Sequence, residues 1–136
     1  MNAPRVSVVI PLRDAGPHVE ELLAALDAQT LPRAEREHLV ALAPSSDDAR
    51  RQLEAARRAG RIDALIDNPT GLAATGLNLA IARAGGEIVV RLDARTRPEP
   101  NYLAAAASAL DRTGAAAVGG AMILRGRGPG AAPSRR

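Results

Sequence analysis

Charged side chains come directly after an apolar stretch in "EIVVRLDART", residues 87–96. Asp93 ends the apolar run, and Arg95 follows two positions later. A carboxylate at the end of a buried strand can hold a hard divalent cation, because such cations take oxygen ligands. Asp93 can equally turn the chain by accepting local backbone N–H bonds. Its position in the sequence leaves both roles open.

Arg95 cannot be a metal ligand, because a guanidinium has no free lone pair and stays protonated. It can hold a phosphate through paired hydrogen bonds and neutralise the charge of a leaving group. The alternative is a solvated loop arginine beside Arg97, which is the commoner role for an arbitrary arginine.

Two further loops carry polar groups. "PLRDAG" places Pro11, Arg13 and Asp14 after the first apolar run, where they form an ordinary turn or hold a base or ribose. "PSSDD" places Asp47 at the start of a helix, where capping is the default role and a ribose contact is the alternative.

The segment "DNPTGLAATGLNLAIARAGGE" has a Gly-rich entry to a helix, with Thr75 and Asn78 near its start. Backbone N–H groups and small side chains at such a place let a nucleotide approach closely. The segment has neither G-x-G-x-x-G nor a P-loop, so dinucleotide and P-loop binding have no support. His18 and His38 are each isolated in the sequence, and we expect both at the surface.

The polar loops must be positioned by the elements around them. Short runs rich in Val and Ile, bounded by turn residues, predict strands that are buried on both faces. Apolar residues spaced i, i+3, i+4, i+7 between these runs predict helices with one apolar face. The expected strands cover residues 6–12, 37–43, 62–67, 87–93 and 115–123, and the expected helices begin near Pro17, Ser46, Ala73 and Leu103.

Strand and helix alternate four times before the last strand. This order predicts an α/β fold with a Rossmann-like, doubly wound and mostly parallel sheet. In such sheets ligands bind beyond the carboxyl ends of the strands, near the point where the strand order reverses. We therefore expect the loops after strands one, two and four to meet at one edge of the sheet.

Length and composition limit the number of domains, the partners and the size of the core that we expect. The 136 residues predict one domain over 1–123, and the Gly, Pro and Arg of 124–136 predict a disordered tail. The formal net charge is +3, but the tail holds four of the arginines and no acid, so the rest is nearly neutral and a nucleic-acid partner is not expected. Tyr102 is the only aromatic residue, so the core should be thin.

The chain contains no Cys, which excludes disulfides, thiolate metal sites and a cysteine nucleophile. The first residues do not have the pattern expected of a secretory leader, and no apolar stretch is as long as we expect of a transmembrane segment. We expect a cytoplasmic protein, with the inner face of the membrane as an alternative location.

Three segments within residues 5–123 together resemble the N-terminal part of glycosyltransferase family 2, the inverting GT-A enzymes that use nucleotide-diphosphate sugars. The succinoglycan-type subgroup is the most similar. The segments are "VSVVIPLRDAGPHVEELLAALDAQTLP", "DNPTGLAATGLNLAIARAGGEIVVRLDARTRPEPNYL" and "AAVGGAM". The resemblance implies a domain of the GT-A fold that binds a nucleotide-diphosphate sugar for transfer to a glycan or lipid acceptor in polysaccharide biosynthesis.

The resemblance also implies a set of site residues. Asp93 matches the first acid of the family's D-x-D motif, which binds Mg²⁺ or Mn²⁺ together with the sugar diphosphate. Arg95 replaces the second acid, so the metal site is either weakened or replaced by direct pairing of Arg95 with phosphate. Leu42 and Ala43 replace acids that contact the base or ribose, which leaves base selection open. The implied nucleotide-sugar-binding residues are Pro11, Arg13, Asp14, Asp47, Asn78, Asp93 and Arg95.

The acceptor-binding half of the family, with the general base that inversion requires, has no match in the sequence. We therefore expect a chain that is incomplete for catalysis, either a truncated or frameshifted product or the first of two pieces that needs a complementary chain. The alternative is a non-catalytic fragment that acts, if at all, through association with another protein or with itself.

Overall fold

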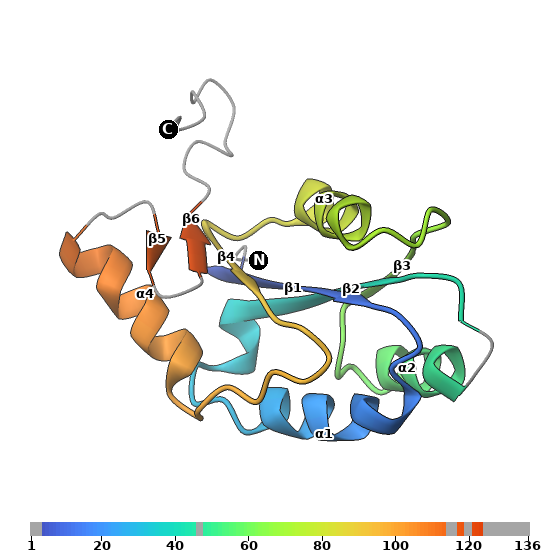
Figure 1. The fold of residues 1–136 in the computed structure, drawn as a ribbon. Coiled ribbons are helices and arrows are strands. Elements are labelled where there is room, and N and C mark those ends of the chain that lie inside the picture. The colour runs from blue at the N-terminus through green and yellow to red at the C-terminus, as the bar shows by residue number, and fades with distance from the viewer. Residues whose placement is uncertain (1–3, 46–47, 114–116, 119–120, 124–136) are drawn as a thin grey trace.

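The computed structural model describes residues 4–45, 48–113, 117–118 and 121–123, and these form a single six-stranded sheet (Figure 1). The strands lie in the order β3-β2-β1-β4-β6-β5. β1 to β4 are mutually parallel, and β6 pairs antiparallel with both β4 and β5. The predicted Rossmann-like, mostly parallel α/β fold is therefore confirmed. The strands are β1 (Val6–Leu12), β2 (Arg36–Leu42), β3 (Ala64–Asp67), β4 (Ile88–Arg91), β5 (Ala117–Val118) and β6 (Ala121–Ile123).

Helices connect the parallel strands where the apolar spacing predicts them. They are α1 (Gly16–Asp27), α2 (Asp48–Arg58), α3 (Ala73–Arg83) and α4 (Tyr102–Thr113), with a short 3₁₀ turn at Arg33–Glu35. Pro17 lies in the first turn of α1, where its missing N–H leaves no intrahelical bond unmade. Ser46, the predicted cap of α2, lies outside the described residues.

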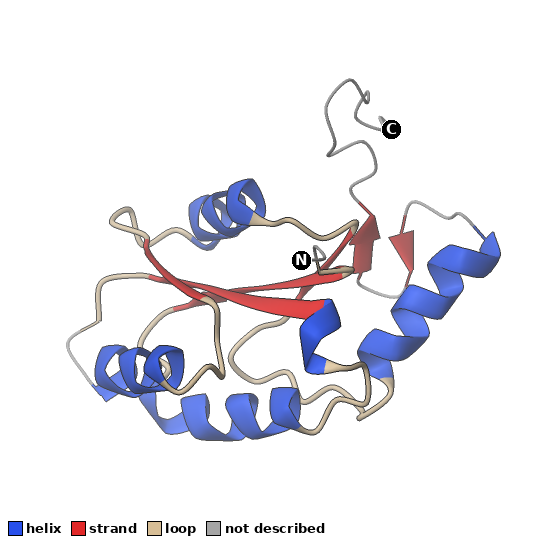
Figure 2. Cartoon of the chain, turned by 180° about the vertical axis from the view of Figure 1, so that it is seen from behind, coloured by secondary structure: helices blue, strands red, loops and turns tan. Residues whose placement is uncertain are grey.

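The helices form two unequal layers on the sheet. α1, α2 and α4 cover one face and α3 alone covers the other (Figures 1 and 2). Alternate residues of β1 point to opposite faces, so Val8 and Ile10 join the core under α1 while Val9 joins the smaller core under α3. Among the described residues, no helix is long and apolar enough to cross a membrane.

The strand order places a reversal between β1 and β4. From β1 the chain steps outward to β2 and β3 on one side, and β4 then returns to the other side of β1. Because all four strands are parallel, their carboxyl ends lie along one edge of the sheet. The loops after these strands are therefore the segments that can build a common site.

The predicted strands over 37–43 and 62–67 are shifted or shortened by one or two residues, and the last two predicted strands differ more. β4 ends at Arg91, two residues before Asp93, because the chain enters a tight turn in which the Thr96 N–H bonds to the Asp93 carbonyl at 2.9 Å. The single strand predicted over 115–123 is two short antiparallel strands, β5 and β6, and residues 119–120 between them lie outside the described part of the chain.

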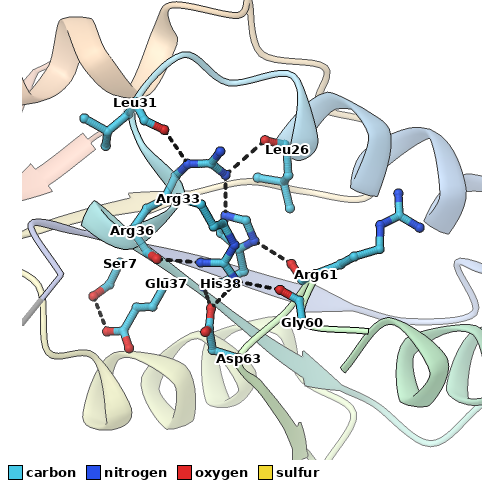
Figure 3. Close-up of polar contacts among 10 residues, drawn as sticks. All are labelled: Ser7, Leu26, Leu31, Arg33, Arg36, Glu37, His38, Gly60, Arg61 and Asp63. Carbon is cyan, nitrogen blue, oxygen red and sulfur yellow. Dashed lines mark hydrogen bonds and ion pairs between the residues drawn. The ribbon is translucent and has the colours of Figure 1, made fainter. Parts of the chain in front are cut away.

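The prediction that His38 lies at the surface is wrong. β2 is a central strand, flanked by β1 and β3 and covered on both faces, so the His38 side chain has no exposed surface. Figure 3 shows its ring between the Arg36 guanidinium and the Arg61 carbonyl. Arg36 Nη1 lies 2.9 Å from Nε2 and can only donate, so Nε2 accepts and Nδ1–H donates to the Arg61 carbonyl at 2.8 Å. Burial lowers the pKa of His38 to about 4.

Arg36 is also buried, and it donates to carbonyls at the C-terminal end of α1 and in the loop that follows it. Its Nε donates to the Leu31 carbonyl at 2.9 Å and its Nη1 to the Leu26 carbonyl at 3.0 Å. Carbonyls at the end of a helix have no intrahelical partner and carry partial negative charge, so a guanidinium stabilises them. This cluster lies at the amino end of β2, at the opposite edge of the sheet from the loops that follow β1 to β4.

Candidate functional site

A cavity of about 150 Å³ lies where the loops after β1, β2 and β3 converge. We call it the Arg13 pocket, because the guanidinium of Arg13 is its charged group. Arg13 lies against Gly71, where an added Cβ would be 3.4 Å from Nη2. Gly71 also has a φ of 75°, which a residue with a side chain rarely adopts. The lining residues are Pro11, Leu12, Arg13, Ala43, Asn68, Gly71 and Ala73.

Asn68 holds the loop after β3 in shape. Its side chain is 3% exposed, its Nδ2 donates to the Leu72 carbonyl at 2.9 Å, and its Oδ1 accepts from Thr70 Oγ1 at 2.9 Å. The Asn68 backbone N–H donates to the Leu42 carbonyl at 3.0 Å, which fixes the loop to the end of β2. These bonds place Gly71 opposite Arg13 and start α3 at the wall of the pocket.

The loop after β1 is fixed to the loop after β2. Asp14 has a φ of 45°, in the left-handed region that Asp tolerates better than most residues. Its backbone N–H donates to Ser45 Oγ at 3.2 Å, and Ser45 Oγ donates to the Ala43 carbonyl at 3.1 Å. The predicted residues Arg13 and Asp14 are thus on one anchored loop, and Pro11 lies just before it, within the last two residues of β1. Asp47 lies outside the described residues.

A second cavity, of about 330 Å³, shares Asn68 with the first. We call it the Asp67 pocket. Asp67 at the end of β3 accepts an ion-pair bond from Arg50 of α2 at 2.6 Å, and both side chains line the cavity. Leu42 lines it as well, at a position where the family resemblance leads one to expect an acid. The lining residues are Leu42, Pro44, Arg50, Asp67, Asn68 and Pro69.

Sequence reasoning missed Asp67, Asn68 and Arg50 as site residues. Asp67 and Asn68 directly follow the third apolar run, in the same way that Asp93 follows the fourth. The rule that sites form at the carboxyl ends of strands therefore applied to them. For Arg50, on a helix, the sequence gives no comparable signal, because its helical position does not reveal its pairing with Asp67.

Asn78 lines neither pocket. The stripe of α3 that faces the sheet contains Gly76 and Ala80, both buried, whereas Asn78 is exposed. Two residues along a helix correspond to about 200° of rotation, which turns Asn78 away from the sheet. Its predicted contact with the nucleoside stays a prediction.

Asp93 and Arg95 lie in the turn after β4, and both are exposed. Arg91 Nε donates to Asp93 Oδ1 at 3.1 Å, so the carboxylate already has a cationic partner. The Asp93 backbone N–H donates to Thr96 Oγ1 at 3.0 Å, which closes the turn. Asp93 therefore serves the turn through its backbone, while its carboxylate forms an ion pair.

The residues of this turn do not fit a divalent cation. Mg²⁺ and Mn²⁺ prefer several oxygen ligands, and the described part of the chain has no group of three or more His, Cys, Asp or Glu that could hold a metal ion. Asp93 is a single carboxylate that is paired with Arg91 and followed by Arg95. The chemistry of these side chains favours an anion over a cation.

Known proteins share this architecture. Residues 7–136 match the family described as Glycosyl transferase family 2. Glycosyltransferase AglE of Haloferax volcanii is 29% identical over 120 residues, which are 86% of this chain and 39% of AglE. The family match includes residues 124–136, which we expected to be a tail and which lie outside the described residues.

Solved structures superimpose on most of the chain. The mannosyltransferase PcManGT from Pyrobaculum calidifontis, in complex with GDP-Man and Mn²⁺, is 30% identical with a TM-score of 0.71, and the match covers 83% of this chain and 34% of that one. S. aureus TarS 1–349 in complex with UDP-GlcNAc is 24% identical with a TM-score of 0.73, over 82% of this chain and 32% of that one, which supports the fold.

This chain therefore spans about a third of the length of these relatives. The succinoglycan-type subgroup stays a prediction. The family itself follows from the match over nearly the whole chain together with the shared fold: this chain belongs to glycosyl transferase family 2.

Proposed function

We propose that this chain binds a nucleotide-diphosphate sugar in the Arg13 and Asp67 pockets, as the donor half of an inverting hexosyl transfer to a glycan or lipid acceptor. The observation that carries the proposal is Arg13, a guanidinium with no hydrogen-bond or ion-pair partner among the described residues, in a pocket at the carboxyl ends of β1, β2 and β3. A guanidinium binds phosphate oxygens through paired, charge-assisted hydrogen bonds.

The pockets suit the two ends of such a donor. Pro11, Leu12 and Ala43 give the Arg13 pocket an apolar wall, and Gly71, which has no side chain, leaves room for the Arg13 guanidinium. The Asp67 pocket has the size of a small-ligand site, about 300 Å³ or more. The exposed oxygens of Asp67 can accept hydrogen bonds from a ribose or base, while the Arg13 guanidinium binds a phosphate.

The relatives suggest two candidate nucleotides, GDP and UDP. PcManGT is described with GDP-Man and TarS with UDP-GlcNAc. The metal, either Mg²⁺ or Mn²⁺, and the contacts of Asp14, Asp47 and Asn78 with the donor remain predictions. So do the acceptor, a complementary chain and the cytoplasmic location.

Inverting transfer also requires a general base. A general base must take the proton of the acceptor hydroxyl on the face of the sugar opposite the leaving diphosphate. The family resemblance assigns that role to none of the residues in this chain. We therefore expect donor binding, and no sugar transfer, from the chain as given.

The test is the thermal unfolding midpoint with UDP and with GDP, for the wild type and for Arg13→Ala. A nucleotide at about 100 times its Kd stabilises the fold by about 2.7 kcal/mol, a shift of several degrees for a domain of this size. We expect one of the two nucleotides to give this shift in the wild type and a much smaller one in Arg13→Ala.

The matched control is Arg83→Ala. Arg83 is an exposed arginine in the last turn of α3, at the far edge of the sheet. This variant should keep the full shift. No shift with either nucleotide in the wild type would refute the proposed function.

A further inference from the structure

The segment Arg91–Arg97 forms a turn that is closed by hydrogen bonds, and we call it the Arg95 turn. Its backbone is closed by the two bonds between Asp93 and Thr96, one in each direction, at 3.0 and 2.9 Å. Arg97 donates to the Ala94 and Thr96 carbonyls at 2.8 and 2.9 Å, and to Glu21 of α1 at 2.9 Å. These bonds close the turn and link it to α1, the helix that follows β1.

The Arg95 side chain takes no part in these hydrogen bonds. Arg91 is engaged with the Asp93 carboxylate, and Arg97 is engaged with backbone carbonyls and Glu21. Arg95 is exposed and has no hydrogen-bond or ion-pair partner among the described residues. A guanidinium whose charge is not neutralised, in the turn that follows β4, is available to a ligand at this edge of the sheet.

The charges of the turn can replace a cation. Two carboxylates together with a divalent cation have no net charge, and Asp93 together with Arg95 likewise has none. Changing an acid to an arginine adds two positive charges, the same amount that the cation would bring. A metal ion bound by Asp93 would in addition be repelled by Arg91 and Arg95.

We propose that Arg95 binds the diphosphate of the donor directly and that nucleotide binding by this chain does not need a divalent metal. The inference rests on the proposed function, because it concerns the same ligand, and it extends the site to Arg95, which lines neither the Arg13 pocket nor the Asp67 pocket. It adds a residue that determines how the diphosphate is held. The chemical class of ligand is a nucleoside diphosphate, and the shared contact is with its phosphate oxygens.

The test measures the dissociation constants of UDP and GDP by calorimetry, in EDTA and in Mn²⁺, for the wild type, Arg95→Ala and Arg95→Asp. For the nucleotide that binds, we expect wild-type values within about twofold of each other in the two conditions. Arg95→Ala should weaken binding by about tenfold in both, as expected for the loss of a charge-assisted contact. Arg95→Asp recreates an acid pair, so its binding should be weak in EDTA and recover in Mn²⁺.

The outcomes separate the two proposals. Wild-type binding that disappears in EDTA and returns with Mn²⁺ would overturn the metal-independent site and leave the proposed function intact. Equal binding by Arg95→Ala and the wild type would also overturn it. Binding of neither nucleotide in either condition would refute the proposed function, and with it this inference. Arg83→Ala serves as the control for removal of an exposed arginine, and the unfolding midpoints of all variants check that they fold.

Discussion

At the scale of single residues, His38 is held neutral by its surroundings. Burial is the main cause of its low pKa, and the nearby charges of Arg33 and Arg36 lower the pKa further. The bond to the Arg61 carbonyl and the charge of Asp63 act in the opposite direction. The folded pKa of about 4 lies below the ordinary value of 6.5, so folding favours the neutral ring.

This shift predicts a loss of stability in mild acid. The unfolded chain takes up a proton at His38 near pH 6.5, and the folded chain does so only near pH 4. The contribution of neutral His38 to the free energy of unfolding is therefore complete above pH 6.5 and is lost as the pH falls towards 4. At pH 4 the loss should be about 3 kcal/mol. Urea unfolding at pH 7 and pH 4 measures it.

His38→Gln is the control for this pH dependence. The Gln amide can accept from Arg36 and donate to the Arg61 carbonyl, but it does not titrate. The fall in unfolding free energy between pH 7 and pH 4 should be smaller in this variant by about 3 kcal/mol. Equal falls in the two proteins would show that the protonation of His38 does not limit stability.

At the scale of elements, α3 and the loop after β3 are packed together at Gly76. A Cβ at this position would lie 2.9 Å from Asn68 Nδ2 and 3.4 Å from the Ala41 Cβ. Asn68 cannot move without disturbing its bond to the Leu72 carbonyl. The close approach of helix and loop therefore determines the shape of the wall that faces Arg13.

Gly76→Ala should weaken nucleotide binding. The displaced Asn68 moves the loop that carries Gly71, and we expect UDP or GDP binding to fall by roughly fivefold, about 1 kcal/mol. Calorimetry with the nucleotide that binds the wild type measures this change.

Gly60→Ala separates backbone strain from damage to the site. Gly60 has a φ of 81° with nothing within 4 Å of an added Cβ, at the turn before β3. Its replacement should lower stability by about 1 kcal/mol without changing nucleotide affinity. If Gly76→Ala binds nucleotide as well as Gly60→Ala does, the loop after β3 is not part of the site.

At the scale of the whole molecule, the two layers on the sheet have unequal cores. α1 contributes the buried side chains Val19, Leu22, Leu23 and Leu26 to one face. α3 contributes only Gly76 and Ala80 as buried residues to the other, with Leu77 and Ile81 partly buried. Because burial stabilises by roughly 25 cal/mol per Å² of apolar area, α3 is held less strongly.

Hydrogen exchange should reveal this difference. The amides of α3 should exchange through an opening of lower free energy than those of α1, by roughly 1–2 kcal/mol. Because Ala73, the first residue of α3, lines the Arg13 pocket, a bound nucleotide should slow exchange in α3. Mass spectrometry of peptides from the two helices measures both effects. Equal protection of α1 and α3 would contradict the unequal layers.

The sequence by itself determined the elements and their order. The bounds predicted for the first strand, 6–12, are those observed, and the helices begin within a few residues of the predicted starts. These features depend on periodicity and turn residues, which are properties of neighbouring residues. The position of Pro11 and Arg13 at the carboxyl end of β1 followed from the same local information.

Only the tertiary structure decided which side chains meet. His38 is buried because β2 has a neighbour on each side and a helix layer on each face, none of which is encoded near His38 itself. Asp67 and Asn68 join the pockets because the loop after β3 folds against the end of β2, whereas Asn78 faces solvent. Such contacts join residues far apart in the sequence, so they are settled by the packing of the sheet and its two helical layers and not by local pattern.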